Sequence, residues 1–197
     1  MGKSGRAVGL RDLTLAKVIT NTTETYEADE PKKIFKAVSG KVTVKRSSEK
    51  IYSDDELEDT ESALDSIDVE LTGDKLTMER IADIYGCRFV KGMLIDNQDD
   101  SPAELALGYR VRESNGKYRF VWLYCGKFDG DDEDEHETRG EKPSPKTKTI
   151  KGTFYARKKD GNFRVRVHES ELLETHTEAK EVIKSWFSEV QEPLEEA

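Results

Sequence analysis

The residues of this chain that could carry chemistry are mainly carboxylates, and they are gathered in two runs. Six acids lie between positions 54 and 61, and seven lie between positions 129 and 137. A carboxylate that acts as a general acid usually stands alone in apolar surroundings, where burial raises its pKa. The two runs therefore predict solvated surface segments and no catalytic site.

The second acidic run could instead be a calcium loop. An EF-hand loop carries ligands at positions 1, 3 and 5, glycine at position 6 and glutamate at position 12. Counting from Asp129 or from Asp131, no glycine falls at position 6. We therefore favour a long, mobile acidic loop over residues 129–145 and expect no metal site.

Histidine and cysteine offer no clear alternative chemistry. None of His136, His168 and His176 stands at zinc-ligand spacing from an acid or a cysteine. Cys87 and Cys125 form no CxxC pair, so we expect small buried side chains and leave their redox state open. A catalytic triad is a spatial arrangement that sequence does not exclude, but neither G-x-S-x-G nor a Gly-rich phosphate loop is present. We predict no catalytic residue, no cofactor and no enzyme.

Composition indicates one domain, or at most two small ones, with a thin core. The 197 residues are 37% charged and 35% hydrophobic, whereas charged residues average about 25% in soluble domains. Either long loops carry the charge or the chain completes its burial against other subunits. A net charge of −9 disfavours tight binding of duplex DNA, which needs Lys and Arg on the phosphates. No apolar run is long enough to cross a bilayer, so we expect no membrane partner.

The element most clearly specified is a hairpin over residues 104–128 that turns at Asn115-Gly116. A two-residue type I′ turn there needs positive φ at both positions, which Asn and Gly tolerate. The resulting register predicts one buried face with three pairs, Leu107 with Tyr124, Tyr109 with Trp122 and Val111 with Phe120. The opposite face becomes polar toward the turn, where Arg112 would face Arg119.

Periodicity predicts the other elements and a mainly β, antiparallel fold, a β-sandwich or barrel with a short central helix and a C-terminal amphipathic helix. Strands are expected at 13–20, 34–45, 64–71, 89–95 and 146–158, the last forming a second hairpin with 163–167. Helices are expected at 77–85, capped by Thr77 and Gly86, and at 175–192, with a Thr175–Glu178 capping box. Residues 1–197 then form a single domain, with an N-terminal arm at 1–10 and an extended loop at 46–63.

Several segments, in this order, resemble the major tail protein family of long, non-contractile-tailed bacteriophages of Gram-positive hosts. The resemblance spans nearly the whole chain and is carried by Val8-Gly9-Leu10 with Leu13, Ala16 and Lys17, by IYSDD at 51–55, ALGYR at 106–110, NGKYRFVWLY at 115–124, TIKGTF at 149–154 and Trp186-Phe187. Cys125 and the long acidic run after it depart from the pattern.

The resemblance implies a structural virion protein with a tail-tube-like fold. Six copies would form a ring, and rings would stack into the tube that conducts DNA to the host during ejection. The implied partners are further copies of the chain, a tape measure protein, a tail terminator and a distal tail protein, with phage DNA passing through without specific binding. The implied location is the virion, after assembly in the bacterial cytoplasm.

This interpretation places expected roles on six residues. The arm and the extended loop are too polar to pack in a monomer core, so we expect Val8, Leu10, Ile51 and Tyr52 to contact neighbouring subunits. The inner wall of a tube must be strand, so we expect the alternating acids Asp68 and Glu70 to face the lumen. A negative wall would let DNA slide.

Two alternatives stay open. One is a ring-forming tail terminator or injection-tube component, which would not form long tubes. The other is a free-standing acidic β-sandwich binding module, whose acidic segments recognise a basic partner and which would be a stable monomer.

Overall fold

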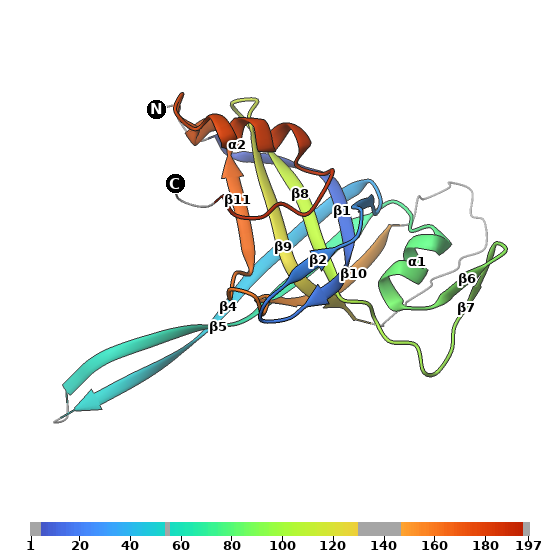
Figure 1. Ribbon diagram of the computed structural model, residues 1–197, viewed down its shortest axis with the longest axis horizontal. Coiled ribbons are helices and arrows are strands. Elements are labelled where there is room, and N and C mark those ends of the chain that lie inside the picture. Colours follow the sequence, from blue (N-terminus) through green and yellow to red (C-terminus); the bar gives the residue numbers. More distant parts are fainter. Residues whose placement is uncertain (1–4, 54–55, 130–146, 195–197) are drawn as a thin grey trace, which may run out of the picture.

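The computed structural model describes residues 5–53, 56–129 and 147–194, with side chains described for all of these except 49–61 (Figure 1). The protein is mainly antiparallel β with two short α-helices, as the alternation predicted. Its elements are β1 (Ala7–Asn21), β2 (Tyr26–Ala28), β3 (Lys32–Lys33), β4 (Ala37–Ser53), β5 (Glu56–Gly73), α1 (Met78–Tyr85), β6 (Arg88–Val90), β7 (Met93–Ile95), β8 (Leu105–Glu113), β9 (Tyr118–Phe128), β10 (Lys148–Tyr155), β11 (Arg164–His168), the 3-10 turn η1 (Glu169–Glu171), α2 (Thr177–Val182) and the 3-10 turn η2 (Ile183–Ser185).

One large antiparallel sheet forms the body, in the strand order β2-β1-β8-β9-β10-β5-β4, with β3 added to β1 and β11 added to β9. The sheet curls until β1 and β4 contact each other. The two strands approach closely at Gly40 of β4. A Cβ atom added to Gly40 would lie only 2.5 Å from Leu10 Cδ2 of β1. No ladder joins these two strands in the described part of the chain, so the result is an incompletely closed barrel rather than two stacked sheets.

The inside of the curl holds the larger hydrophobic core. Alternate residues of β1, β5, β8, β9 and β10 fill it, and Ile84 and Tyr85 of α1 pack against them. In β5 the side chains of Ile67, Val69 and Leu71 are buried while Asp68 and Glu70 point outward, which confirms the alternation expected there.

The expected register of the β8–β9 hairpin is wrong by one residue. Asn115 keeps a negative φ, and only Gly116 adopts a positive one, of 82°. Gly116 N donates to Glu113 O, and Glu113 N donates to Lys117 O, so the loop has three residues rather than two. Tyr109 therefore pairs with Val121, not with Trp122, and Arg119 faces Val111 instead of Arg112.

A register slip of one residue moves every side chain of β9 to the other face. Leu123 and Val121 accordingly join Leu107 and Tyr109 in the inner core, while Phe120, Trp122 and Tyr124 point outward. The outer face is also buried, because a second core covers it, built from Ala16, Val18, Tyr26, Ala106, Phe120, Trp122, Tyr124, Cys125 and Trp186. The Trp122 ring occupies the space above Gly108, where a Cβ would lie 2.6 Å from it.

Residues 46–53 and 56–63 form strands, not the expected loop. The β4–β5 ladder continues from Lys45–Ser66 at the body to Ser53–Glu56 near the turn, and the hairpin extends away from the rest of the molecule (Figure 1). At the N-terminus, the arm expected over 1–10 is also strand from Ala7, and Gly5 already donates to the Glu113 carboxylate. The loop expected over 129–145 lies outside the described residues except for Asp129.

The second hairpin predicted from the sequence does not form as a ladder. β10 pairs with the end of β9, from Cys125 to Phe128, and β11 pairs with its beginning, from Arg119 to Leu123. The two strands therefore follow each other along one edge of β9, because β9 is long enough to pair with both. The turn that joins them is held by Arg157 N donating to Asn162 O.

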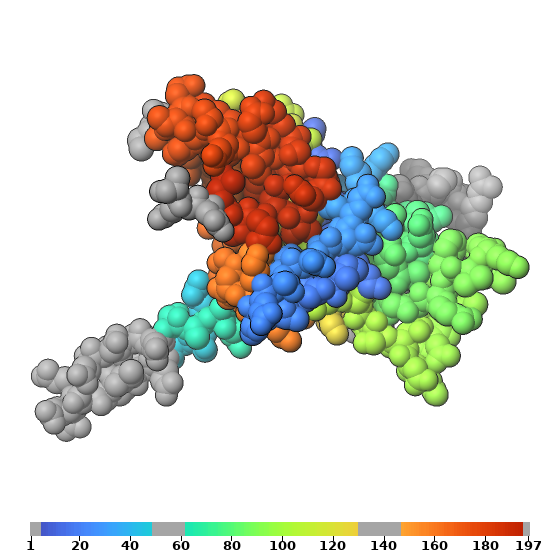
Figure 2. Space-filling view, in the orientation of Figure 1, coloured from blue at the N-terminus to red at the C-terminus, as the bar shows by residue number. Residues whose placement is uncertain are grey.

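The central helix is confirmed and the C-terminal helix is shorter than predicted. Thr77 Oγ1 accepts from Arg80 N, and Gly86 ends α1 in the left-handed region. At the C-terminus α2 ends at Val182 and continues as a 3-10 turn, and its N-cap is His176 without a side-chain hydrogen bond, so the expected capping box is wrong. The apolar stripe still packs on the outer core with Trp186 buried, and Figure 2 shows this segment spread over the body.

Arg157 fastens the C-terminal segment to the sheet. Its side chain is only 1% exposed, yet its guanidinium donates to both oxygens of Asp160 and of Glu192 at 2.5–2.8 Å. The guanidinium also lies 4.2 Å from the centre of the Tyr124 ring. Hydrogen bonds from Arg157 are the main reason that the pKa of Asp160 lies below its ordinary value.

Replacing Arg157 by methionine removes the counter-charge of Asp160 and leaves Glu192 with the more distant Lys159, at 3.6 Å. Both carboxylates are partly exposed, so we expect the free energy of unfolding to fall by about 1.5–3 kcal/mol, the range for hydrogen bonds to charged groups. Urea denaturation measures this. Lys158→Met removes the neighbouring exposed cation and should cost under about 0.5 kcal/mol. Equal losses in the two variants would contradict this role of Arg157.

The same ion pairs make stability depend on pH. A carboxyl group whose pKa is lower in the folded state stabilises the fold above its unfolded value, here about 3.8, and this contribution is lost as the pH falls further. Wild-type stability should therefore decrease more steeply below pH 4 than that of Arg157→Met. Parallel curves from a pH series of urea titrations would show that Asp160 is not linked to Arg157 in this way.

Candidate functional site

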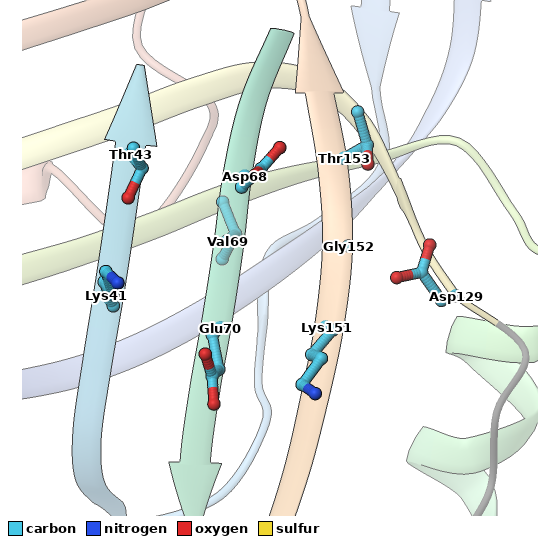
Figure 3. A pocket seen from close by; sticks show the side chains of 9 residues that line it. All are labelled: Lys41, Thr43, Asp68, Val69, Glu70, Asp129, Lys151, Gly152 and Thr153. Atoms are coloured by element: carbon cyan, nitrogen blue, oxygen red, sulfur yellow. The ribbon is translucent and has the colours of Figure 1, made fainter. Parts of the chain in front are cut away.

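A polar hollow of about 360 Å³ lies on the outer face of β4, β5 and β10 (Figure 3). Its lining alternates along the three strands because paired positions of neighbouring strands share a face. Glu70 is paired with Lys41 on one side and with Lys151 on the other, and Asp68 lies between Thr43 and Thr153 in the same manner. Asp129, at the end of β9, completes the rim.

Lysines balance the acids of this hollow. Lys45 Nζ lies 2.6 Å from Asp68 Oδ2, and the hydrogen bond and charge of Asp68 raise the pKa of Lys45. Three lysines, at 41, 45 and 151, thus stand near three acids, at 68, 70 and 129. The surface that carries Asp68 and Glu70 is close to neutral in its described part, and its side chains are suited to hydrogen bonding and charge pairing.

A second hollow, of about 300 Å³ and mainly apolar, lies where β1 and β4 fail to pair. It is lined by Ala7, Gly9, Leu10, Gly40, Val42, Leu71, Tyr109 and Val111. The hollow exists because the sheet curls without closing, which leaves inward side chains of β4 and of the first part of β1 uncovered. It offers shape and apolar contact, with Tyr109 as its one polar side chain.

The structure divides the four expected contact residues between two regions. Leu10 lines the apolar hollow, and Val8, two residues earlier on β1, is 61% exposed. Ile51 and Tyr52 lie in the outer part of β4, paired with Asp59 and Leu57 of β5, and their side chains lie outside the described set. Within one molecule, Val8 and Leu10 therefore lie in a different region from Ile51 and Tyr52. Whether they meet between subunits stays a prediction.

Cys87, Asp96 and Asp100 form a small titratable cluster, with one ligand-type atom of each within 4.8 Å of the others. Burial, reinforced by both carboxylates, raises the pKa of the Cys87 thiol to about 12. Cys125 is a free cysteine in the outer core, and burial, with the carboxylate of Glu104, raises its pKa to about 12 as well. Both thiols are thus protonated and weakly nucleophilic at neutral pH.

Sequence reasoning missed Glu113, a carboxylate that is only 1% exposed. Burial opposes its charge, but a hydrogen bond from Gly5 N at 3.2 Å and the Arg119 guanidinium hold its pKa below the ordinary value. Ser170 Oγ also contacts it at 3.4 Å. Glu113 joins the start of the chain, the hairpin turn and η1, and no pattern in the sequence marks it as buried.

Sequence reasoning also missed a group of arginines that includes Arg164 and Arg166. A signal was available, because two arginines separated by one residue on a strand point to the same face. Their surroundings depend on the pairing of β11 with β9, which the sequence did not predict.

The sequence matches no model of a known protein family, and a search of curated proteins finds no match either. Among the described residues no helix is long and apolar enough to cross a membrane. The fold and its surfaces are therefore the basis for any assignment.

The Cys87 cluster allows a direct test of its electrostatics. Removing the two charges in Asp96→Asn/Asp100→Asn should lower the thiol pKa, and each unit of pKa gives about a tenfold higher thiolate fraction at fixed pH. We expect alkylation of Cys87 by iodoacetamide at pH 8.5 to accelerate several-fold, followed by peptide mass spectrometry. Asp99→Asn is the matched control and should leave the rate unchanged. If the double variant also reacts at the wild-type rate, the carboxylates do not control this thiol.

Proposed function

We propose that this protein is a structural subunit that polymerises through its strand edges, as stacked hexameric rings of a phage tail tube. The observation that carries the proposal is the β4–β5 hairpin. It is built from strands of 17 and 18 residues, and it extends beyond the sheet that it begins in (Figure 1). A two-stranded ribbon is only marginally stable alone in water, so it gains stability from a partner surface.

The outer edge of β4 supports the same proposal. In the described part of the chain β4 pairs only with β5, although it is a full 17 residues long. Long free edges pair readily with other chains, and most monomeric proteins shorten or cover them. An edge that is kept long and open is suited to joining sheets of neighbouring subunits into a ring.

The hollows fit an interface better than a reaction. The polar hollow presents balanced lysines and acids on exposed strands, and the apolar hollow lies at the open seam of the sheet. A heterologous contact that closes gives a ring, and a second heterologous contact between rings gives a tube. The open side of the sheet between β1 and β4 is one surface, and the projecting β4–β5 hairpin is another. Such an assembly needs two distinct contact surfaces.

The remaining features of the proposal follow the resemblance. A subunit charge of −9 is repeated in every copy, which favours passage of DNA over its capture. The proposed partners are further copies, a tape measure protein, a tail terminator and a distal tail protein. The proposed location is the virion, after assembly in the bacterial cytoplasm.

Shortening the hairpin tests the proposal. Ser47 pairs with Ala63, so residues 48–62 can be replaced by Asn-Gly while Val44 and Leu64 keep their places against the core. We expect the wild-type protein to form rings or hollow tubes and the shortened variant to stay monomeric with nearly unchanged stability. Negative-stain electron microscopy and sedimentation velocity over a concentration series give the readout.

The matched control replaces the similarly long segment 131–145 by a short Gly-Ser linker and should leave assembly intact. Tubes from the variant with the shortened hairpin would show that the hairpin is not the contact. A wild-type protein that is monomeric at every concentration would contradict the polymer and favour a free-standing binding module.

A further inference from the structure

Four arginines, which we call the arginine patch, follow β9 and β11 to the base of the β4–β5 hairpin: Arg119, Arg166, Arg164 and Arg46. The pairing of β11 with β9 sets Arg164 beside Leu123 and Arg166 beside Val121, while Val121 also pairs with Tyr109. Paired positions share a face, so the two arginines lie on the same side as Arg119 and Tyr109. Arg46, at the base of the hairpin, is close enough to Arg164 for their charges to interact.

Three of these arginines have no counter-charge among the described residues. No carboxylate of the described residues forms a salt bridge with Arg46, Arg164 or Arg166, although 41 acids are present in the chain. Arg119 is paired with Glu113 at 3.2 Å, yet its Nε is buried without a hydrogen-bond partner. Unpaired guanidinium groups so close together are suited to an anionic ligand with several carboxylates or phosphates.

The local electrostatics agree with this reading. Burial, together with the positive charges of Arg166 and Arg46, holds the pKa of Arg164 below its ordinary value. Like charges at short range are mutually destabilising, and an anion bound between them removes that repulsion while it forms charge-assisted hydrogen bonds.

We propose that the arginine patch binds the acidic tip of the β4–β5 hairpin, residues 54–61, of a second copy of this chain; this rests on the self-assembly proposed above. The tip carries six acids and no cation in eight residues. Each copy holds the arginine patch at the base of its hairpin and the acids at the end of the same hairpin, so the contact repeats from copy to copy.

The outer end of the hairpin lies far from the arginines of its own chain. The ladder runs from the Arg46–Leu64 pair to the Ser53–Glu56 pair, with a register shift between Ile51 and Tyr52, and seven residues of strand span about 23 Å. The outer end is therefore placed to meet another molecule. Because the two surfaces differ, the contact is heterologous and can propagate.

Charge reversal on each side tests the contact. Arg164→Glu/Arg166→Glu and, separately, Glu56→Lys/Glu58→Lys/Asp59→Lys should each raise the concentration needed for assembly roughly tenfold or more, because like charges then oppose each other. The chain that carries both sets of changes should assemble again near the wild-type concentration. Sedimentation velocity and electron microscopy follow assembly, and thermal denaturation verifies that each variant is folded.

A control in the other acidic run, Asp131→Lys/Asp132→Lys/Glu133→Lys, should assemble as the wild type does. If this set, combined with the arginine reversal, restores assembly in place of the hairpin set, the hairpin tip is not the occupant. If a labelled single-stranded DNA oligonucleotide binds the wild type but not Arg164→Glu/Arg166→Glu, while assembly is the same in both, the arginine patch serves nucleic acid and the proposal is overturned.

The two proposals fail in different ways. If the wild type assembles and neither reversal changes the required concentration, the arginine patch is not the contact, while polymerisation stands. If the wild type never assembles, polymerisation fails and this contact fails with it.

Discussion

Burial of the β8–β9 hairpin on both faces is the constraint on which the rest of the structure depends. Tyr109 and Val121 face the interior of the curled sheet, while Trp122 and Tyr124 face the second core under the C-terminal segment. A strand with two buried faces tolerates no register error, because a slip of one residue would exchange both sets of side chains. The three-residue turn at Gly116 and the missing side chain at Gly108 set this register. The C-terminal segment is held on the outer core by Arg157 for the same reason, since without it the aromatic face would meet water.

Such a core uses most of the apolar residues in a small volume and leaves the charges to the periphery. The outer face of β4, β5 and β10 carries balanced lysines and acids, and the arginines follow β9 and β11 to the base of the hairpin. The thin core suggested by the composition is thus a dense centre with long, polar extensions. These extensions contribute little burial within one molecule, and their stability depends on what they contact.

The sequence predicted the parts of the fold that depend on local periodicity. The alternation of Ile67, Val69 and Leu71 and the capped helix from Met78 to Tyr85 are confirmed, because each depends on a few neighbouring residues. The predictions that failed depend on choices between close alternatives. Asn-Gly suits a two-residue and a three-residue loop alike, and a charged, alternating segment such as 46–63 suits either a loop or a ribbon. The pairing of β11 with β9 depends on the length of β9 and has no local signal.

The expected functional residues likewise divide into features that local periodicity predicts and features that depend on strand pairing. Asp68 and Glu70 face outward as their alternation required, but their lysine neighbours come from β4 and β10 and could be known only from the register. Glu113 and the arginines depend on three strands meeting at one place, so no single stretch of sequence marks them. It follows that the charge of a surface in this protein is decided by strand pairing rather than by composition. A chain of net charge −9 can therefore present a cationic surface near the base of the same hairpin whose tip is acidic, and this separation along one ribbon gives the molecule a direction in which copies can follow one another.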